Sequence, residues 1–178
     1  MKIIINKIIT LALTSNSNPE AFASIYRVAM AKNPTASKTD IDLHFAAFTG
    51  DLIVKIIQES ARKQKVLGYN MKQIYYPLSD RYKKSKIRNT SRFWMHTGWT
   101  IRNLSSWVSN DKVYIGFRDN VRHPNSKAYA QSILAYNDNG TMKTVARPLL
   151  STILQDYVFN FDKYVNLYLE YLSKVRIA

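Results

Sequence analysis

The chain has 178 residues, of which 46% are hydrophobic and 12% aromatic, and this composition excludes a wholly disordered protein. It contains no cysteine, which excludes a disulfide scaffold, a cysteine-based zinc site and a thiol nucleophile. The formal net charge of +14 indicates contact with an anionic partner, either nucleic acid or an acidic protein surface, or else a basic surface of solvated lysines.

The N-terminal segment MKIIINKIITLAL places an apolar run behind a lysine. Asn6 and Lys7 interrupt this run, so no signal-peptide core forms, and the run is too short to cross a bilayer. The segment has an apolar stripe formed by Ile3, Ile4, Ile8 and Leu11. We therefore expect an amphipathic helix that packs on its own domain or on a neighbouring copy.

Two helices are predicted next. The first begins at Pro19, because proline suits the first helical position. The second begins at Thr39, with Asp42 three residues later as a partial capping box, and it extends to about Lys65, before a stop at Gly68. Its apolar positions keep helical spacing and are Ile41, Phe45, Phe48, Leu52 and Ile56.

The segment YYPLSDRYKKSKIRNTSRF, residues 75–93, predicts a long basic loop with one short helix starting at Ser79. It has no sustained apolar period, and no acidic residue follows Asp80 within it. Its cations should therefore face solvent or an acidic partner, since burying unpaired cations is prohibitive. These cations are Arg81, Lys83, Lys84, Lys86, Arg88 and Arg92.

Trp94 and Trp99 flank the dipeptide Thr97-Gly98. Two explanations are open: chemistry at His96 and Thr97, or the start of a helix. We favour a helix start, in which Thr97 is the N-cap and Gly98 allows a neighbouring chain to approach closely. The two tryptophans then act as anchors, either as ordinary core aromatics or as contacts at an interface.

The segment LSSWVSNDKVYIGF predicts a β-hairpin that turns at Asn110-Asp111. The following segment, SKAYAQSILAYNDNGT, is ambiguous between strand and helix. Pro148 should start a helix of about 25 residues, or roughly 37 Å. Its apolar positions recur every three or four residues and are Leu150, Leu154, Tyr157, Phe161, Tyr164, Tyr168 and Leu172.

This order of elements predicts an α+β fold with N-terminal helices, a small antiparallel sheet with a long basic loop, and a long C-terminal helix. We expect an N-terminal helical region at residues 1–68 and an α+β core at residues 69–178, together forming one compact domain.

Motifs for catalysis are missing from the sequence. The three histidines, His44, His96 and His123, have no metal-ligand spacing, and the five glycines form no phosphate-binding loop. The twelve acidic residues form no paired motif. We therefore expect no enzyme activity, no catalytic residue, no metal and no cofactor.

Five segments of the chain, in order, resemble the virion-morphogenesis family of tailed bacteriophages, which includes head–tail joining, neck and tail-completion proteins. The resemblance covers roughly residues 76–172. The matching residues are Pro77, Leu78, Ser79 and Tyr82, then Thr97 and Gly98, then Val113, Ile115 and Gly116, then Tyr129, Ala130 and Gly140, and finally Ala146, Arg147, Pro148 and Leu150. The departures are Trp99 in place of a leucine-type residue, Asn137 near the expected glutamate, and Leu149 in place of phenylalanine.

The resemblance implies a structural protein that forms a homo-oligomeric ring, six- or twelve-fold, between the portal of the capsid and the tail. Such a ring is a head–tail connector, a tail-completion protein or a tail terminator, is assembled in the host cytoplasm, resides in the virion neck and contacts no membrane. Its partners would be other copies, the adjoining portal or adaptor ring, tail proteins and possible packaged double-stranded DNA in the lumen.

Two sets of residues follow from this interpretation. The interaction set comprises Arg81, Lys83, Lys84, Lys86, Arg88, Arg92, Trp94 and Trp99, and the structural-motif set comprises Pro77, Thr97, Gly98, Gly116, Gly140, Arg147 and Pro148. The alternative is a basic nucleic-acid-binding protein that uses segment 81–94, with Tyr82, Phe93 and Trp94 stacking on bases.

Overall fold

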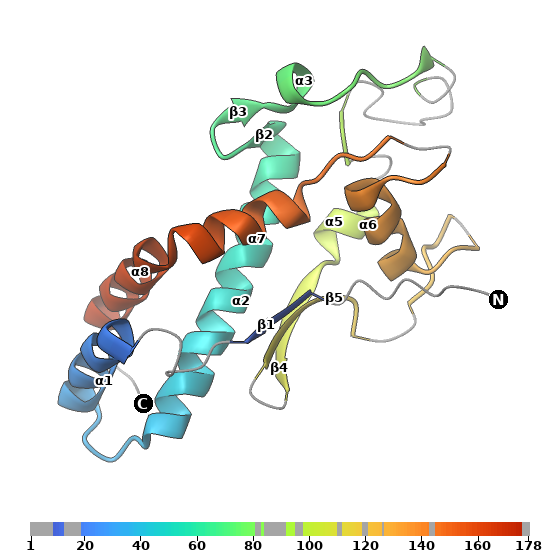
Figure 1. Cartoon of the computed structure of the whole chain (residues 1–178). Helices are drawn as coiled ribbons and strands as arrows, with labels where there is room; N and C mark the ends of the chain where they lie inside the picture. The colour runs from blue at the N-terminus through green and yellow to red at the C-terminus, as the bar shows by residue number, and fades with distance from the viewer. Residues whose placement is uncertain are drawn as a thin grey trace.

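The computed structural model of the chain describes residues 9–12, 19–80, 83, 92–94, 98–109, 112–118, 121–125, 127–142 and 145–175. Helices and small antiparallel sheets make up this part of the chain (Figure 1), which confirms the predicted α+β class. None of the described helices has both the length and the apolar character that a bilayer-spanning segment needs. The elements are, in chain order, β1 (Ile9–Ala12), α1 (Pro19–Lys32), α2 (Lys38–Lys63), β2 (Lys65–Val66), β3 (Tyr69–Asn70), α3 (Met71–Ile74), α5 (Trp99–Arg102), β4 (Ser105–Ser109), β5 (Lys112–Gly116), α6 (Ala130–Asn139), α7 (Leu150–Phe159) and α8 (Phe161–Lys174).

Helix α2 runs through the middle of the fold and contacts the sheet as well as α1, α7 and α8 (Figure 1). A capping box begins it: the Asp40 amide donates to the Ser37 hydroxyl at 3.1 Å, and the Ser37 amide donates to the Asp40 carboxylate at 3.2 Å. The predicted cap at Thr39 is therefore wrong. Both candidate pairs have capping-box spacing, but Asp42 instead accepts a hydrogen bond from the Tyr26 hydroxyl of α1 at 2.7 Å.

The end of α2 leads into a second small sheet that was not predicted. Gln64 caps the helix in the left-handed conformation, with φ of 56°, and β2 then pairs with β3 across the turn at Leu67 and Gly68. Gly68 has φ of 88°, so it supplies the positive φ that a tight hairpin turn requires and does not itself stop the helix. Strands of two residues have no detectable period, so sequence patterning could not find them.

Strands β1, β5 and β4 form an antiparallel sheet in that order. The predicted β4–β5 hairpin is confirmed, and Ser109 pairs with Lys112 across a connection that lies outside the described residues. The predicted N-terminal helix is wrong for Ile9–Ala12, which forms β1 along β5, while residues 1–8 and 13 lie outside the described part. An unpaired edge of β5 favours a partner strand, and β-branched residues such as Ile9 and Thr10 suit that strand.

A glycine lets α2 lie close to this sheet. A Cβ atom at Gly50 would come within 2.8 Å of Val113 Cγ1 and 2.9 Å of Ser106 Cβ, which is closer than non-bonded carbon atoms approach. The Ser106 hydroxyl also donates to the Asp51 carboxylate at 2.6 Å, so a hydrogen bond holds the same strand against the helix. Gly50 therefore sets the distance between α2 and the sheet.

We expect Gly50→Ala to lower the free energy of unfolding by about 1–2 kcal/mol, because overpacking costs about 1–3 kcal/mol and alanine regains up to about 1 kcal/mol of helix propensity. Urea titration followed by circular dichroism measures this change. Thr39→Ala, at an exposed position of the same helix, is the control and should shift stability by less than about 0.5 kcal/mol. A Gly50→Ala protein as stable as the parent would contradict the close approach.

The long C-terminal helix is two helices, α7 and α8, which differ from the predicted single helix by a break at Asn160. Asn160 has φ of −120° and ψ of 39°, and its side-chain Nδ2 donates to the Asp156 carboxylate at 2.8 Å. Asparagine has a low helix propensity, and here its φ and ψ are not helical, so the apolar period continues through Asn160 while the helix does not. The predicted face is confirmed: its buried members are Leu150, Tyr157, Tyr164, Tyr168 and Leu172.

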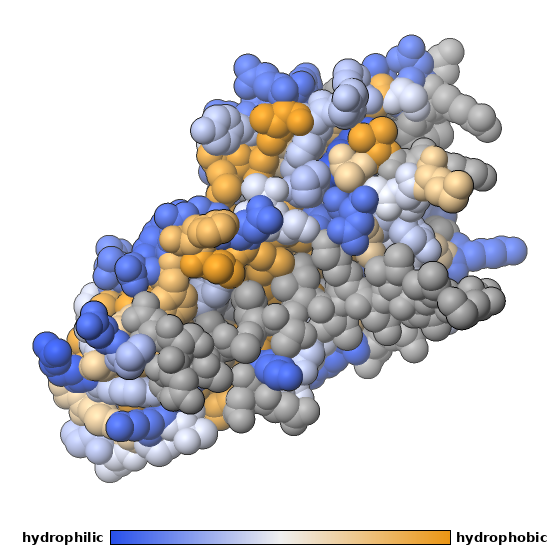
Figure 2. Space-filling model, viewed as in Figure 1, coloured by the Kyte–Doolittle hydropathy of each residue, from blue (hydrophilic) through white to orange (hydrophobic). Residues whose placement is uncertain are grey.

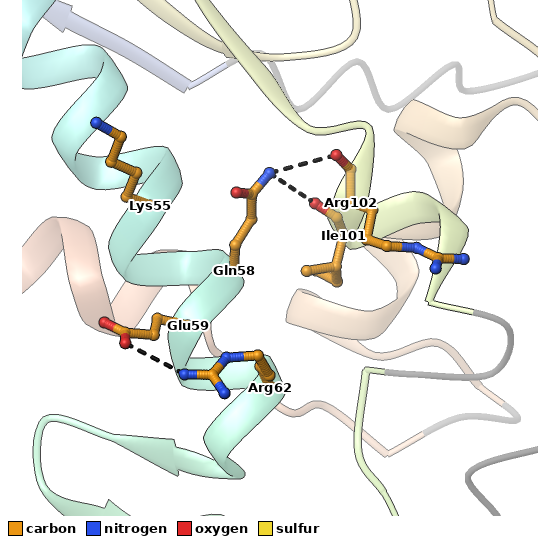
Figure 3. A pocket seen from close by; sticks show the side chains of 6 residues that line it. All are labelled: Lys55, Gln58, Glu59, Arg62, Ile101 and Arg102. Carbon is orange, nitrogen blue, oxygen red and sulfur yellow. Dashed lines mark hydrogen bonds and ion pairs between the residues drawn. The ribbon is translucent and has the colours of Figure 1, made fainter.

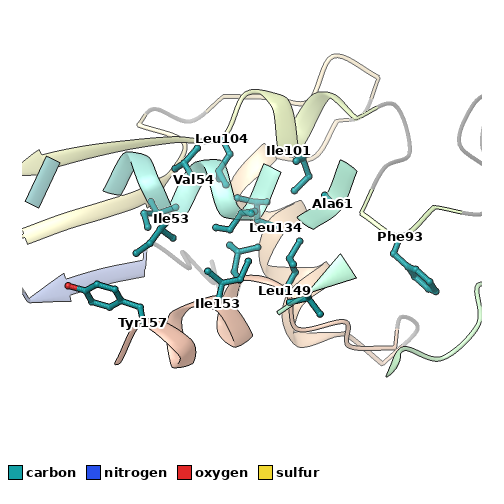
Figure 4. Packing of buried hydrophobic residues seen from close by; sticks show 14 of the residues in the cluster. Ile53, Val54, Ala61, Phe93, Ile101, Leu104, Leu134, Leu149, Ile153 and Tyr157 are labelled. Atoms are coloured by element: carbon teal, nitrogen blue, oxygen red, sulfur yellow. The ribbon is translucent and has the colours of Figure 1, made fainter. Parts of the chain in front are cut away.

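Two apolar clusters form the core among the described residues. The larger one joins the C-terminal half of α2 to the sheet, α6 and α7 (Figure 4), and includes Ile53, Ile57, Leu134 and Ile153. The smaller one joins α1, the N-terminal half of α2 and α8 through Phe22, Phe45 and Tyr168, among other residues. Each cluster contains residues from both sides of residue 68, such as Ile53 with Leu134 and Phe45 with Tyr168. The boundary at residue 68 between a helical region and an α+β core remains a prediction from sequence.

Candidate functional site

The basic loop is described at only two of its six cations. Arg81, Lys84, Lys86 and Arg88 lie outside the described residues. The Lys83 amide donates to the Ser79 carbonyl oxygen at 2.9 Å, which agrees with the helical turn predicted to start at Ser79. The Lys83 ammonium lies 3.1 Å from the Asp80 carboxylate, and Arg92 is exposed. Pro77 precedes this turn and is exposed.

The end of the loop is fixed to the core through Phe93 and Trp94. The Phe93 amide donates to Gln64 Oε1 at 2.7 Å, and its ring, which is 3% exposed, lies 5.5 Å from the Arg147 guanidinium. Trp94, which has φ of 60°, donates its indole N–H to the Arg147 carbonyl oxygen at 3.0 Å. The sequence predicted Trp94 as an anchor and Arg147 as a motif residue, and the structure brings the two together.

Tyr75 connects the start of the loop to the same junction. Its hydroxyl donates to the Pro148 carbonyl oxygen at 3.0 Å, and its ring packs edge-on against Phe93 with centroids 5.6 Å apart. Burial, followed by the nearby Asp138 carboxylate, raises the pKa of Tyr75 to about 12, so the hydroxyl remains a donor at neutral pH. Both ends of the segment between Tyr75 and Phe93 are therefore held at the start of α7.

Asp138 is a central residue that sequence reasoning missed. It is 1% exposed, and its carboxylate accepts hydrogen bonds from the Leu150 amide at 2.8 Å and the Ser151 amide at 3.2 Å, as well as from the Ser151 hydroxyl. A carboxylate at a helix N-terminus satisfies unpaired amides and complements the helix dipole. The resemblance put Asn137 near the expected glutamate, whereas the residue with a buried, hydrogen-bonded carboxylate is its neighbour Asp138.

The start of α5 differs from the prediction in its capping residue. The N-cap is Gly98, with φ of 77° and no side-chain cap, and the predicted N-cap Thr97 lies outside the described residues. The Trp99 ring stacks on Phe117 with centroids 5.8 Å apart and meets His123 edge-on at 5.2 Å. Trp99 is half-buried within the subunit, so its contacts support the core interpretation more than the interface one.

Of the two remaining motif glycines, Gly116 makes a close contact with a side chain and Gly140 ends a helix. A Cβ atom at Gly116 would come within 2.7 Å of Gln131 Oε1, and this oxygen accepts a hydrogen bond from the Phe117 amide at 3.0 Å. Gly140 has φ of 75° and ends α6, with its amide donating to the Tyr136 carbonyl oxygen at 3.0 Å. Both are positions at which a larger residue would strain the backbone or displace a neighbour.

The histidines have structural surroundings. His44 Nδ1 lies 2.6 Å from the Tyr168 hydroxyl oxygen, and burial raises the pKa of Tyr168. His123 Nδ1 accepts a hydrogen bond from the Asn125 amide at 3.2 Å, and His96 lies outside the described residues. Within the described part of the chain, no three histidine, aspartate or glutamate residues gather in a way that could hold a metal ion.

Two exposed apolar patches lie away from the core. The first, which we call the hairpin patch, covers β2, β3 and the adjoining α3 segment and consists of Leu67, Tyr69, Ile74 and Tyr76. The second, the elbow patch, lies at the end of α7 and consists of Val158 and Phe159, which are 63% and 82% exposed. Figure 2 shows apolar surface over both regions. Large exposed aromatic side chains grouped in this way are typical of interaction surfaces.

Comparison with known proteins gave no match: no family model, no curated protein and no solved structure is similar to this chain at a significant level.

Proposed function

We propose that this chain is a structural virion protein of a tailed bacteriophage, which forms a homo-oligomeric ring in the neck and joins the capsid portal to the tail. In this proposal the ring is a head–tail connector or a tail-completion or terminator ring, of six- or twelve-fold symmetry, and its work is assembly rather than catalysis.

The observation that supports this proposal most is that residues in or beside three of the five segments of the resemblance contact one another. Trp94, which precedes Thr97-Gly98, donates to Arg147 of the last segment. Asp138, beside Gly140 of the fourth segment, caps the helix that follows Pro148. An ordered set of motifs that meets at one junction is expected if the motifs specify a shared fold.

The exposed apolar patches suit a subunit of a ring. A closed ring repeats one heterologous contact, so each subunit needs two different surfaces that complement each other. The hairpin patch and the elbow patch occupy different elements of the same chain and are rich in aromatic side chains, which favour interfaces. The proposal assigns these patches to contacts between copies.

The alternative function, nucleic-acid binding by segment 81–94, has less support. It requires Phe93 and Trp94 to stack on bases, together with Tyr82, which lies outside the described residues. Phe93 is buried against Arg147 and Tyr75, and the Trp94 indole is hydrogen-bonded inside the subunit. Stacking on bases would break these contacts.

The basic loop provides the test of joining. Lys83→Gln, Lys84→Gln and Lys86→Gln together should reduce the fraction of joined heads and tails in an in vitro assembly assay, while the subunit still folds. Each exposed ion pair contributes only up to about 1 kcal/mol, but every subunit of a ring repeats the loss.

A matched control removes the same charge elsewhere, through Lys112→Gln, Lys127→Gln and Lys174→Gln at exposed positions outside both patches. This control should join normally. Normal joining by the loop variant, combined with poor retention of packaged DNA, would instead assign the loop to the DNA in the lumen.

A further inference from the structure

One face of α2 is hollowed along most of its length. A hollow of about 530 Å³ lies between α2 and α5 and is lined by Lys55, Gln58, Glu59, Arg62, Ile101 and Arg102 (Figure 3). A second, of about 290 Å³, lies between α2 and α8, and its lining includes His44, Phe48, Asp51, Leu52 and Tyr171. Lys55 lines both hollows, so we treat them as one feature, the α2 groove. From residue 44 to residue 62 the helix rises about 27 Å.

The α2–α5 end of the groove is held rigidly. Gln58 Nε2 donates to the Ile101 carbonyl oxygen at 3.2 Å and to the Arg102 carbonyl oxygen at 3.4 Å, so one side chain of α2 is bonded to the backbone at the end of α5 (Figure 3). The Ile101 carbonyl oxygen also accepts the Leu104 amide at 3.3 Å, so backbone and side-chain bonds together fix this end. The groove therefore exists before any partner arrives, which lowers the entropic cost of binding.

The groove combines apolar walls with a cationic rim. Phe48, Leu52 and Ile101 supply apolar surface, and the aliphatic part of Lys55 adds to it. The two carboxylates in the lining are already engaged within the subunit. The Lys63 ammonium lies 2.8 Å from the Glu59 carboxylate and lowers the pKa of Glu59, and the Arg62 guanidinium lies 3.4 Å from the same carboxylate (Figure 3).

Asp51, the other carboxylate, accepts the Ser106 hydroxyl at 2.6 Å. The lining contains three cations, Lys55, Arg62 and Arg102, against these two carboxylates, so it keeps a net positive charge although Arg62 pairs with Glu59. A partner that places carboxylates along this rim would meet complementary charge, whereas a cationic partner would not.

We propose that the α2 groove binds an acidic amphipathic helix from a protein other than this one, with its apolar side chains on the groove walls and its carboxylates at the cationic rim. The length of the groove matches about 18 helical residues. Helices recognised in grooves place apolar anchors at spacings of three and four, which this combination of walls and rim suits. The proposal rests on the proposed function only in naming the source of the helix as an adjoining virion protein.

Two other occupants fit less well. A second copy of this chain has a net charge of +14 and would bring cations to a cationic rim. DNA would meet the same cations, but its phosphates would leave the apolar walls formed by Phe48, Leu52 and Ile101 uncovered. The acidic helix alone uses both the walls and the rim.

The test is fluorescence anisotropy of labelled probes titrated with the full-length protein. The main probe is a synthetic peptide of about 18 residues, with leucine at helical spacings of three and four and glutamate at most other positions. A second peptide replaces each leucine with serine and keeps the charge, and the third probe is a DNA duplex of similar length. The groove variant is Lys55→Glu with Arg62→Glu. Its control is Lys72→Glu with Lys127→Glu, which makes the same change in net charge at exposed positions outside the groove.

We expect the leucine peptide to bind the parent protein and the control variant, and to bind the groove variant about tenfold more weakly, since each exposed ion pair contributes up to about fivefold. The serine peptide should bind the parent protein at least tenfold more weakly than the leucine peptide.

The proposal would be overturned if the groove variant and the control lost the same amount of affinity for the leucine peptide. It would also be overturned if the leucine and serine peptides bound the parent protein equally well. DNA binding that the groove variant loses, while peptide binding remains, would overturn it in favour of a phosphate site. If the peptide result holds but the protein forms no ring, the proposed function fails and the groove stands. If rings form and the peptide does not bind, the groove proposal fails and the proposed function stands.

Discussion

Asp138→Ala is expected to lower the free energy of unfolding by about 2–4 kcal/mol. The carboxylate is buried and accepts the Leu150 and Ser151 amides at the start of α7, together with the Ser151 hydroxyl. Its removal leaves buried donors without an acceptor, at about 1–3 kcal/mol for each unsatisfied group, and removes the helix cap. Guanidinium chloride unfolding, followed by both circular dichroism and tryptophan fluorescence, measures the loss.

Asp138→Asn is the matched variant. Asparagine keeps one acceptor oxygen and the size of the side chain but loses the charge that complements the helix dipole, so we expect about half of the alanine effect. The fluorescence change should report the junction directly, since Trp94 is hydrogen-bonded to Arg147, three residues before α7 begins. An alanine variant as stable as the parent protein would show that the cap does not depend on this side chain.

Phe45→Ala is expected to lower the free energy of unfolding by about 3–5 kcal/mol, the range for truncating a buried phenylalanine. Phe45 is fully buried, and its ring lies 5.6 Å from Phe22, 6.0 Å from Phe161 and 5.0 Å from Tyr168 between ring centroids. These partners come from α1 and α8, so the substitution removes the contact that holds three helices together.

Phe159→Ala provides the control for Phe45→Ala. This side chain is 82% exposed, so its removal should change the stability of dilute, monomeric protein by less than about 0.5 kcal/mol. Thermal unfolding followed by circular dichroism compares the two variants. Similar melting temperatures for Phe45→Ala and Phe159→Ala would contradict the placement of Phe45 at the centre of the smaller apolar cluster.

The parts of the fold that sequence predicted are those with a long apolar period. The face of the C-terminal helices followed from spacings of three and four, and Phe45 and Tyr168 are buried as expected. The face predicted for α2 is correct only in its N-terminal half: Phe48, Leu52 and Ile56 are half-buried, and the core is instead formed by residues that include Ile53 and Ile57. The break at Asn160 was not predicted, because the apolar period continues through it. The strand β1 was missed for the opposite reason: its pairing with β5 is a long-range contact, and the local pattern favoured a helix.

The candidate site was predicted only as far as local motifs extend. Thr97-Gly98 correctly marked a helix start, although the cap is Gly98, and Pro148 marked the approach to α7. Asp138 and Gly50 were missed because their roles depend on groups far away in sequence: the amides of Leu150 and Ser151 for one, and strands β4 and β5 for the other. An aspartate near the end of one predicted helix, shortly before a proline that precedes the next helix, is the sequence signal that could have identified Asp138.

The central claim is that this chain assembles into a closed ring through its exposed apolar patches. Sedimentation velocity of the purified protein, with negative-stain electron microscopy of the same fractions, tests it most directly. The account predicts a discrete species of six or twelve times the 20.6 kDa subunit mass, seen as rings, which Val158→Ser with Phe159→Ser converts to monomer. A parent protein that remains monomeric at every concentration tested, or rings that persist unchanged in this variant, would contradict it.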